Sequence, residues 1–529
     1  MYINKRVIEI KKRIFQQDKS KLIVVLILVL GILLRFVNLE KKFYWGDEIR
    51  TSLRTSGHTV EDVVQEIYDG RIIEIESLHK YQFPNSEKDL VDTIKVLMTR
   101  PEHPPLYYLM ARFWMQWFGD SVAVIRSLSA LIGLMAFPCL YWLCLELFES
   151  PQVGWMAVVI IAVSPLHILY AQEARQYSLW TVAILLSSAG LLRAIRIKTK
   201  TGWATYAITL IIGLYSHLLF VLVAISQGVY VLARESGRMS TNVLNYGRAT
   251  FISLITFIPW LLVIIINLSQ ATDAIAEGQK NASLSYLVDR WFRNINRVFF
   301  SADLGSANIF LVLLAIYSIY FICRYTPKPI WLFILSLVGV TSLALAIPDL
   351  LLGGRRSLAI RYMIPPYLGI QLAVAYLFSN KIFMYKNGKR RLWKIGLVLI
   401  ISAGVIIGGM QSQREVIWSK NDDKAKFYLP AGQVINQSAH PLVISDTSPI
   451  NVLTLSHQLD EKVKLQLISK PNILQIPDGF SNIFLLNPSE SLQQAFKQQP
   501  NSPNSQLVLV LQRGADRQNN PQLWELLKP

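Results

Sequence analysis

The stretch LIVVLILVLGILLRFV, residues 22–37, is followed a few positions later by FYWGDE, residues 43–48. A helix needs roughly 20 mostly apolar residues to cross the hydrocarbon core of a bilayer. We therefore predict a first transmembrane span over about Leu22–Val37, which leaves Asp47 and Glu48 close to the membrane surface. A charge costs little there, and a substrate carried by a lipid lies within reach. Two solvated carboxylates beyond the end of a helix are the structural alternative.

The composition is that of a membrane protein with many spans. Hydrophobic residues make up 52% of the 529 residues and charged residues 17%, against about 25% charged residues in a typical soluble domain. The net charge is +18, but the basic residues gather in short loops between apolar stretches. That pattern is typical of cytoplasmic loops and argues against a nucleic-acid surface. The three cysteines lie in or beside apolar stretches, so they predict neither disulfides nor a zinc site.

The positions of the basic residues predict the sidedness of the chain. Seven basic residues before the first span place a basic N-terminus, residues 1–20, in the cytoplasm, and no cleavable signal peptide is expected. The six basic residues within 381–394 also mark a cytoplasmic loop. Within residues 21–410 we predict eleven spans, at about Leu22–Val37, Val122–Phe148, Val153–Tyr170, Leu179–Ala194, Trp203–Tyr215, Leu218–Ala233, Phe251–Leu268, Ile309–Ile322, Ile330–Ile347, Tyr362–Phe378 and Ile395–Met410.

Residues 104–118, PPLYYLMARFWMQWF, form an ambiguous apolar stretch. The stretch is short and carries Arg112 near its middle, so it is either a second span or an aromatic-rich helix in the membrane interface. A crossing here would move the basic run at 196–200 outside, against the positive-inside rule. We therefore predict an interfacial helix, with Arg112 facing lipid headgroups, that follows a long extracytoplasmic loop over residues 40–103.

Residues 411–529 change character and predict a small extracytoplasmic α/β domain. Short β-rich runs alternate there with helical or polar segments. The runs are Leu442–Ser445, Lys464–Ile468, Ile483–Leu486 and Leu507–Leu511. The predicted fold class is thus a polytopic α-helical protein of the plasma (inner) membrane, with about eleven spans, followed by this α/β domain.

Several carboxylates and arginines converge on the extracytoplasmic face in this topology. Carboxylates suit the removal of a proton from a hydroxyl. Arginines suit a phosphate, because the guanidinium is planar, always charged and bidentate. We therefore predict catalytic carboxylates at Asp47, Glu48 and Glu173, and substrate-binding groups at Glu102, His103, Tyr107, Arg175, Tyr177, His217, Arg290, Arg293 and Arg361.

Each group also has a structural interpretation that the sequence leaves open. The arginines within 290–297 are at helical spacing, as in a solvated basic face, and residues 173–175 suit a structural ion pair. His217 suits a cap of the hairpin between two spans. Residues 102–103 are compatible with a proton relay or with half of a metal site. The chain has no Asp-x-Asp motif, so no cofactor is predicted with certainty and a divalent metal is unsupported.

Three sequence motifs follow one another in a distinctive order. They are WGDE at 45–48, EHPPLYYLMARFWMQWFGDSVAVIRSLSALIG at 102–133 and SPLHILYAQEARQYSLW at 164–180. In this order they resemble the C-type, lipid-sugar-dependent glycosyltransferases, within them the bacterial aminoarabinose-transferase and protein O-mannosyltransferase group. The recognisable motifs cover about residues 20–235, and beyond them the span pattern and the arginine before the tenth span agree.

The resemblance implies an inverting transferase with its site on the extracytoplasmic face. Such enzymes move a sugar from a polyprenyl-phosphate carrier to an acceptor hydroxyl or amine. The resemblance places the catalytic carboxylate on Asp47, with Glu48 beside it. It places an acidic and a basic group on Glu102 and His103, and the second outer-loop motif on residues 173–175. His103 stands where many aminoarabinose transferases have a lysine, so the resemblance does not extend to that exact substrate.

Other functions remain open from the sequence. A transporter or flippase of lipid-linked sugars more often shows internal symmetry and polar residues at mid-bilayer, and no repeat is found. A scaffold presenting residues 411–529 leaves the carboxylates and arginines unexplained. A glycan ligase or polymerase stays within the same chemistry. The predicted partners are a polyprenyl-phosphate sugar donor, membrane lipids and an acceptor lipid, glycan or protein, with no nucleic acid.

Overall fold

A computed structural model describes residues 21–268, 282–300, 305, 308–384, 387–415, 422–469, 479–497, 506–512 and 521–527. The predicted basic N-terminus, residues 1–20, lies outside these residues. The chain divides into two compact units. The membrane unit comprises Met1–Leu39, Arg100–Tyr107 and Arg126–Gln413, and the sheet unit comprises Glu40–Thr99, Tyr108–Ile125 and Arg414–Pro529.

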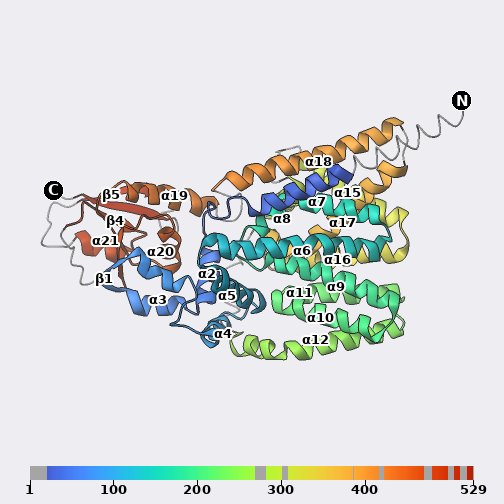
Figure 1. Cartoon of the computed structure of the whole chain (residues 1–529), viewed down its shortest axis with the longest axis horizontal. Helices are drawn as coiled ribbons and strands as arrows, with labels where there is room; N and C mark the ends of the chain where they lie inside the picture. The colour runs from blue at the N-terminus through green and yellow to red at the C-terminus, as the bar shows by residue number, and fades with distance from the viewer. Residues whose placement is uncertain are drawn as a thin grey trace, which may run out of the picture. The chain divides into compact units, whose positions relative to one another are not determined.

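The membrane unit consists of apolar helices joined by short loops. Figure 1 shows α9, α10 and α12 running alongside one another. Two 3-10 turns, η3 (Arg356–Leu358) and η4 (Ile360–Met363), precede α17. After a helix over residues 21–36, the helices are α6 (Val122–Phe148), α7 (Pro151–Ala162), α8 (Pro165–Ala171), α9 (Tyr177–Ile197), α10 (Lys200–Ser216), α11 (Phe220–Arg234), α12 (Thr241–Ile266), α14 (Leu284–Phe299), α15 (Asn308–Tyr325), α16 (Lys328–Leu351), α17 (Ile364–Met384) and α18 (Asn387–Gln413).

These helices show a multi-pass membrane protein. Within the described part of the chain, six helices are long and apolar enough to cross a membrane, and the bent pair α7 and α8 would make a seventh. The stretches predicted as spans lie on helices of the structure. Length and composition alone do not decide how many of them cross, so the count of eleven stays a prediction.

Helices α7 and α8 are bent by 63° at a break between Ala162 and Pro165. Ser164 has extended backbone angles (φ −66°, ψ 120°), and Pro165 is the first residue of α8. A proline has no backbone N–H and pushes the residue before it out of the helical region. The Ser-Pro pair therefore ends one helix and starts the next, and the short α8 then delivers the chain to the polar loop 172–176.

The sheet unit combines the first long loop with the C-terminal residues. Its helices are α2 (Gly46–Ser56), α3 (Val60–Ile67), η1 (Ile75–Tyr81), α4 (Leu90–Thr99), most of α5 (Leu106–Phe118), α19 (Asp422–Asn436), α20 (Pro449–Ser456) and α21 (Glu490–Lys497). Its strands are β1 (Asp69–Glu74), β2 (Pro441–Ser445), β3 (Lys464–Ile468), β4 (Asn482–Leu486), β5 (Gln506–Gln512) and β6 (Gln522–Leu527).

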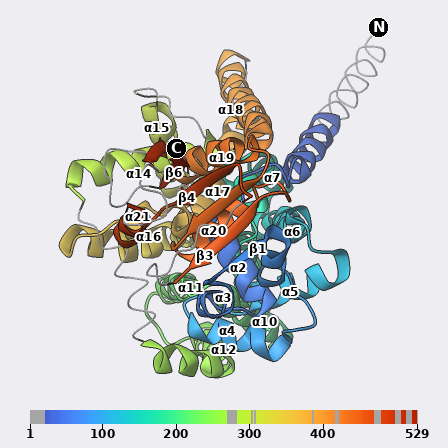
Figure 2. The ribbon, with the colours of Figure 1, turned by 90° about the vertical axis from the view of Figure 1, so that its left-hand side faces the viewer.

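The six strands form one mixed sheet in the order β1-β3-β2-β4-β6-β5 (Figure 2). Strand β2 pairs in parallel with β3 and β4, and the other neighbours pair antiparallel. The four runs that the sequence predicts as strands are β2 to β5, whereas β1 and β6 were not predicted. Strand β1 comes from the first loop and pairs with β3, with Glu74 opposite Lys464 and their side chains 2.6 Å apart.

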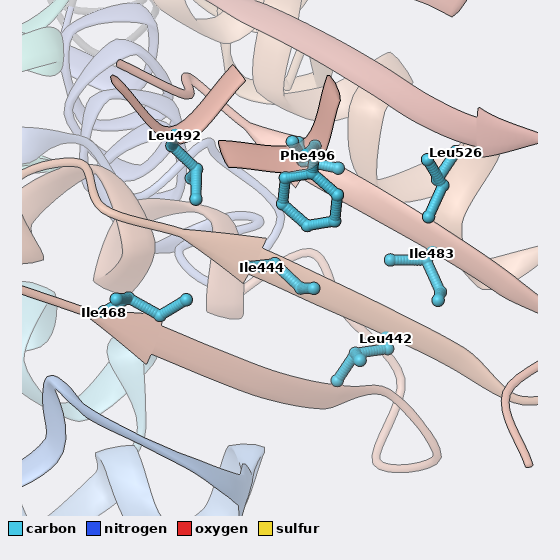
Figure 3. Close-up of a cluster of buried hydrophobic side chains, with 8 residues drawn as sticks. Leu442, Ile444, Ile468, Ile483, Leu492, Phe496 and Leu526 are labelled. Atoms are coloured by element: carbon cyan, nitrogen blue, oxygen red, sulfur yellow. The ribbon is translucent and has the colours of Figure 1, made fainter. Parts of the chain in front are cut away.

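One face of the sheet is covered by α21. Figure 3 shows Leu492 and Phe496 of this helix over residues of the central strands. The buried cluster consists of Leu442, Ile444, Ile468, Ile483, Leu485, Leu492, Phe496 and Leu526. Alternate residues of a strand point to one face, which explains why Leu442 and Ile444 of β2 both belong to this cluster.

Helix α5 has 13 residues, which is about 20 Å of helix and short of the roughly 30 Å of a hydrocarbon core. Its length favours the interfacial interpretation over a span. The expectation that Arg112 faces lipid headgroups is wrong, because this side chain is only 2% exposed. Its guanidinium donates to the carbonyl oxygens of Thr55 (2.8 Å) and Lys88 (2.6 Å) and to the hydroxyl of Thr93 (2.8 Å). Arg112 therefore joins α5 to the end of α2 and to α4.

Candidate active site

In the membrane unit, a buried arginine of the first span contacts the end of α7. Arg35, in the first span, is 1% exposed and donates to the carbonyl oxygens of Ala162 (2.7 Å) and Ile161 (3.1 Å). These two carbonyls end α7, and the break at Pro165 leaves the last carbonyls of a helix without helical partners. Arg35 thus caps the broken helix, and a cation suits a helix C-terminus.

Gln172 fastens the beginning of the same loop to the first span. Its side-chain amide donates to the carbonyl oxygens of Leu34 (2.7 Å) and Val37 (3.2 Å). Helix α9 starts at Tyr177, directly after the loop. Gln172 therefore ties the chain to the first span directly before residues 173–175, and α9 begins shortly after them.

His217 is the aromatic centre of a polar cluster next to this loop. Its ring stacks on Trp180 with centroids 4.2 Å apart, and the rings of Tyr177 and Tyr362 lie at 6.3 and 6.2 Å. Burial lowers the pKa of His217 to about 3, and the charges of Arg175 and Arg361 contribute to this lowering. His217 is therefore neutral at neutral pH.

The tautomer of His217 follows from its backbone contact. The Leu219 amide donates to Nδ1 of His217 at 3.2 Å, so Nδ1 accepts and Nε2 carries the proton. A neutral Nε2–H donor within electrostatic range of two guanidinium groups is suited to oxygen atoms of an anionic ligand. The interpretation that His217 only caps the hairpin therefore leaves most of its surroundings unexplained.

Glu173 lies in the same region as these cations. It is 4% exposed, and Arg175 is 3% exposed. Glu173 and Arg361 both lie within electrostatic range of the Tyr170 hydroxyl. We call Glu173, Arg175, His217 and Arg361 the arginine cluster, since two guanidinium groups dominate it.

The motif at 102–107 joins this cluster through hydrogen bonds. The Tyr107 hydroxyl and Ser129 Oγ are 2.7 Å apart, and Ser129 Oγ donates to the Arg175 carbonyl at 3.4 Å. Gln176 Nε2 and His103 Nδ1 are 3.3 Å apart. Residues far apart in sequence, from the second and third motifs, thus meet.

Glu102 has one oxygen atom that points away from its neighbour. Its Oε1 lies 3.9 Å from His103 Nε2, and its buried Oε2 has no hydrogen-bond partner among the described residues. A buried oxygen of this kind is normally satisfied by a ligand or by water. Glu102 is therefore suited to accept a hydrogen bond from a substrate hydroxyl.

The predicted arginines of α14 differ from one another. Arg293 forms an i,i+4 ion pair with Asp289 at 2.8 Å, with its side chain 39% exposed. Arg290 lies over the ring of Tyr286 at 5.1 Å, and Arg355 lies over the same ring, also at 5.1 Å. Helix α14 is fastened to η3 by a hydrogen bond from Trp291 to Ser357 at 2.9 Å. Arg290 and Arg355 thus form a second cationic pair, while Arg293 has the setting of a surface ion pair.

In the sheet unit, Asp47 and Glu48 occupy the first turn of α2. Negative charge is stabilised there by the unpaired amides and the dipole of the helix. We call these two residues the acidic turn. Glu48 is fully buried, whereas the Asp47 side chain is 19% exposed. Asp47 is therefore the carboxylate of the pair that a substrate can reach.

Two cations accompany Asp47. Arg50 Nη1 lies 3.4 Å from its carboxylate. The second cation is Lys424 of α19. Partial burial of its ammonium lowers the pKa of Lys424, and the charge of Arg50 lowers it further, whereas the charge of Asp47 raises it. The Asp47 carboxylate therefore lies in a positive surrounding that comes from both ends of the chain.

A metal site does not emerge in the part of the chain that the structure describes. No three side chains of histidine, cysteine, aspartate or glutamate gather there in a way that could hold a metal ion.

Some residues of the site were not singled out from the sequence. An arginine within an apolar span is costly and usually functional, so the position of Arg35 was a usable signal. Trp180 and Ser129 carry no such signal, because a tryptophan or a serine in a span is common. Their roles depend on the spans that bring them next to His217 and Arg175.

The chain is similar to known proteins in part of its sequence and in its fold. A family model described as dolichyl-phosphate-mannose-protein mannosyltransferase matches residues 102–263. The fold is similar to that of ArnT from Cupriavidus metallidurans bound to undecaprenyl phosphate, with 13% identity, a TM-score of 0.55, and coverage of 95% of this chain and 97% of that one. Against the apo state of ArnT the identity is 13%, the TM-score 0.54 and the coverage 96% and 98%. No significant match is found among curated protein sequences.

These findings confirm the predicted resemblance to the C-type, lipid-sugar-dependent glycosyltransferases. The same findings confirm the predicted enzyme class, a glycosyltransferase that uses a lipid-linked sugar donor.

Proposed function

We propose that the protein is an inverting glycosyltransferase that moves a sugar from a polyprenyl-phosphate carrier to an acceptor on the extracytoplasmic face of the membrane. One observation carries this proposal. Separate segments of the membrane unit place the buried His217 within electrostatic range of Arg175 and of the half-buried Arg361, and the motif at 102–107 is hydrogen-bonded to the loop that carries Glu173 and Arg175. Buried charges of this kind are rarely kept for stability alone.

The arginine cluster binds the phosphate of the donor in this proposal. Two guanidinium groups and the Nε2–H of His217 supply donors for phosphate oxygens. The similar ArnT structure has undecaprenyl phosphate bound, which supports a ligand of the same class here. Arg290 and Arg355 lie on one tyrosine ring and are suited to the outer part of the phosphate site.

The chemical step needs a base for the acceptor, and we assign this role to Asp47. As the acceptor oxygen or nitrogen attacks the anomeric carbon, its proton passes to the Asp47 carboxylate. The new bond joins the acceptor to the anomeric carbon, and the bond from that carbon to the phosphate oxygen breaks with its electron pair. Attack from the side opposite the leaving phosphate inverts the anomeric centre.

The leaving phosphate also needs electrostatic stabilisation in this scheme. Negative charge grows on the leaving polyprenyl phosphate, and preorganised cations in a buried site offset it, which is usually the largest catalytic contribution. Glu102 and Tyr107 would orient the sugar, since the buried Oε2 of Glu102 can accept from a hydroxyl. Glu48, which is fully buried, supports the turn that carries Asp47 and does not reach the acceptor.

The proposed orientation follows from the basic loops. With the N-terminus in the cytoplasm and eleven crossings, the first loop and residues 411–529 lie outside the plasma (inner) membrane together with the site. The shared sheet of β1 and β3 supports this, because strands of one sheet lie on one side of a membrane. The acceptor, whether lipid, glycan or protein, is open in this proposal.

The test follows sugar release from radiolabelled polyprenyl-phosphate donors by purified protein in lipid, with cell-envelope extracts as acceptors. Asp47→Asn is expected to lower the rate by about 10²–10⁴ through loss of the base. Asp69→Asn, an exposed aspartate of the same unit, is the matched control and should retain full activity. An Asp47→Asn protein that folds normally and transfers sugar at the wild-type rate would show that Asp47 is not the base.

The same assay separates the alternative functions. A flippase would move donors across vesicles without releasing sugar, and a ligase or polymerase would transfer a whole glycan in place of one sugar. Product size and a flipping assay on the same vesicles distinguish these outcomes.

A further inference from the structure

The segment that precedes the acidic turn is held by residues from the other end of the sheet unit. The backbone N–H of Phe43 donates to the carbonyl oxygen of Glu415 at 3.1 Å. The Phe43 ring stacks on Tyr428 of α19, with centroids 6.1 Å apart and planes 15° apart. Both rings are buried, at 5% and 1% exposure. Phe43 is thus fixed to this part of the chain by its backbone and by its side chain.

The next residue, Tyr44, connects the end of α20 to α2. Its ring lies 4.7 Å from that of His457, directly after α20. Its hydroxyl is 2.6 Å from Ser52 Oγ and donates to the Glu48 carbonyl at 3.2 Å. His457 is itself held by Gln82, with Nε2 and Oε1 2.6 Å apart. Tyr44 therefore relays the position of α20 to the first two turns of α2.

Gly46, the first residue of α2, is in close contact with α20. A Cβ atom at this position would lie 3.2 Å from Cγ2 of Ile450. That distance is tighter than most contacts of real side chains, so a larger residue would push α2 away from α20. Residues 43–46 thus set both the position and the direction of the start of α2.

We infer that Glu415, Tyr428, Ile450 and His457 are positioning residues for the transferase reaction, because their contacts fix the segment that leads into the acidic turn. This inference rests on the proposed function of Asp47. The C-terminal α/β domain would then contribute to catalysis by positioning Asp47, and it would not be an independent domain attached to the catalytic part. A displacement of about 1 Å in a reacting group can lower a rate about 100-fold, so even a small shift of α2 should be visible in kcat.

The test compares two phenylalanines that are equally buried in the same unit. Phe43→Leu removes the stack on Tyr428, whereas Phe496→Leu removes a ring from the core between α21 and the sheet. The wild-type side chains of Phe43 and Phe496 are 5% and 6% exposed. We expect Phe43→Leu to lower kcat about 10- to 100-fold, with the KM for the donor changed less than about threefold because binding is not affected. Phe496→Leu should leave both constants near wild type at a temperature where it is folded.

A second measurement reports the position of the turn without any activity. Hydrogen–deuterium exchange of the amides of residues 43–49 should rise in Phe43→Leu and in Tyr428→Leu, but not in Phe496→Leu. Tyr428→Phe keeps the ring and should retain both slow exchange and wild-type kcat. In the double variant of Phe43 and Tyr428, the loss of kcat should be smaller than the product of the two single losses, since both remove one contact.

The outcomes separate the two hypotheses. Wild-type kcat in Phe43→Leu, together with an inactive Asp47→Asn, would overturn the positioning role and leave the proposed function intact. Full activity in Asp47→Asn would overturn the proposed function and this inference with it. Equal losses of kcat in Phe43→Leu and Phe496→Leu would show a general effect of stability and would also overturn the inference.

Discussion

The arginine cluster of the membrane unit and the acidic turn of the sheet unit are both charged, but they are charged in different surroundings. In the cluster, Glu173 and Arg175 are at most 4% exposed, and burial keeps His217 neutral. In the turn, Asp47 keeps a 19% exposed side chain at the start of a helix. Charges interact strongly where water is excluded, whereas a base has to exchange protons with solvent. The arginine cluster is therefore suited to binding a phosphate, and the acidic turn is suited to accepting a proton.

The two regions are also built differently. Loop 172–176 follows the break at Pro165, whose preceding helix end is capped by Arg35, and Gln172 ties the start of the loop to the first span. The acidic turn is held by Glu415, Tyr428 and His457, which lie several hundred positions further along the chain. A local sequence motif therefore predicts loop 172–176, whereas the position of the acidic turn depends on contacts between distant segments of the sheet unit.

The largest effect should separate Arg361 from Arg293, two arginines that the sequence treats alike. Arg361→Gln removes a donor of the buried cluster and should lower kcat about 10²–10³-fold. Arg293→Gln removes a partly exposed guanidinium that pairs with Asp289 and should change kcat less than about threefold. Steady-state sugar transfer measures both. Equal losses would mean that the charge of the whole face matters more than the buried cluster, and the comparison would fail.

A middle-sized effect concerns the support of the acidic turn. Arg112→Met removes the donor of three hydrogen bonds, two of them buried, and we expect it to destabilise the sheet unit by roughly 3 kcal/mol. Arg71→Met, at an exposed arginine 3.5 Å from Asp69, should change stability by less than about 1 kcal/mol. Thermal unfolding in detergent measures both variants. If the two variants unfolded together, Arg112 would have no structural role beyond that of a surface residue.

The smallest effect is a pH dependence from the cluster. The pKa of His217 falls from 6.5 to about 3 in the folded protein, so the unfolded chain binds more protons between these values. Stability is then fully present above pH 6.5 and declines on acidification, by up to about 1.4 kcal/mol per pH unit. His217→Gln should flatten this slope, as measured by unfolding between about pH 7 and 5. Wild type and variant with equal slopes would show that His217 is not buried as a neutral ring.

Much of the membrane unit was predictable, because apolar length and basic loops act locally. The runs of apolar residues mark the helices, and Ser164-Pro165 marks the bend that sets up the loop 172–176. The charged residues at 173 and 175 follow at once in sequence, so their closeness needed no fold. The pairing of Tyr107 with Ser129, and of His103 with Gln176, was not predictable, since serine and glutamine have no distinctive pattern.

The sequence alone determined that this is a membrane protein with a carboxylate pair after its first span, and that its motifs resemble lipid-sugar-dependent transferases. Those features depend on hydrophobic length, charge and residue order, which a chain carries before it folds. The tertiary structure decided that β1 of the first loop completes a C-terminal sheet, that Arg112 is buried, and that Arg175 and Arg361 come within electrostatic range of one neutral histidine. Those features depend on contacts between distant segments, whose free energy comes from burial and shape and leaves no local trace in the sequence.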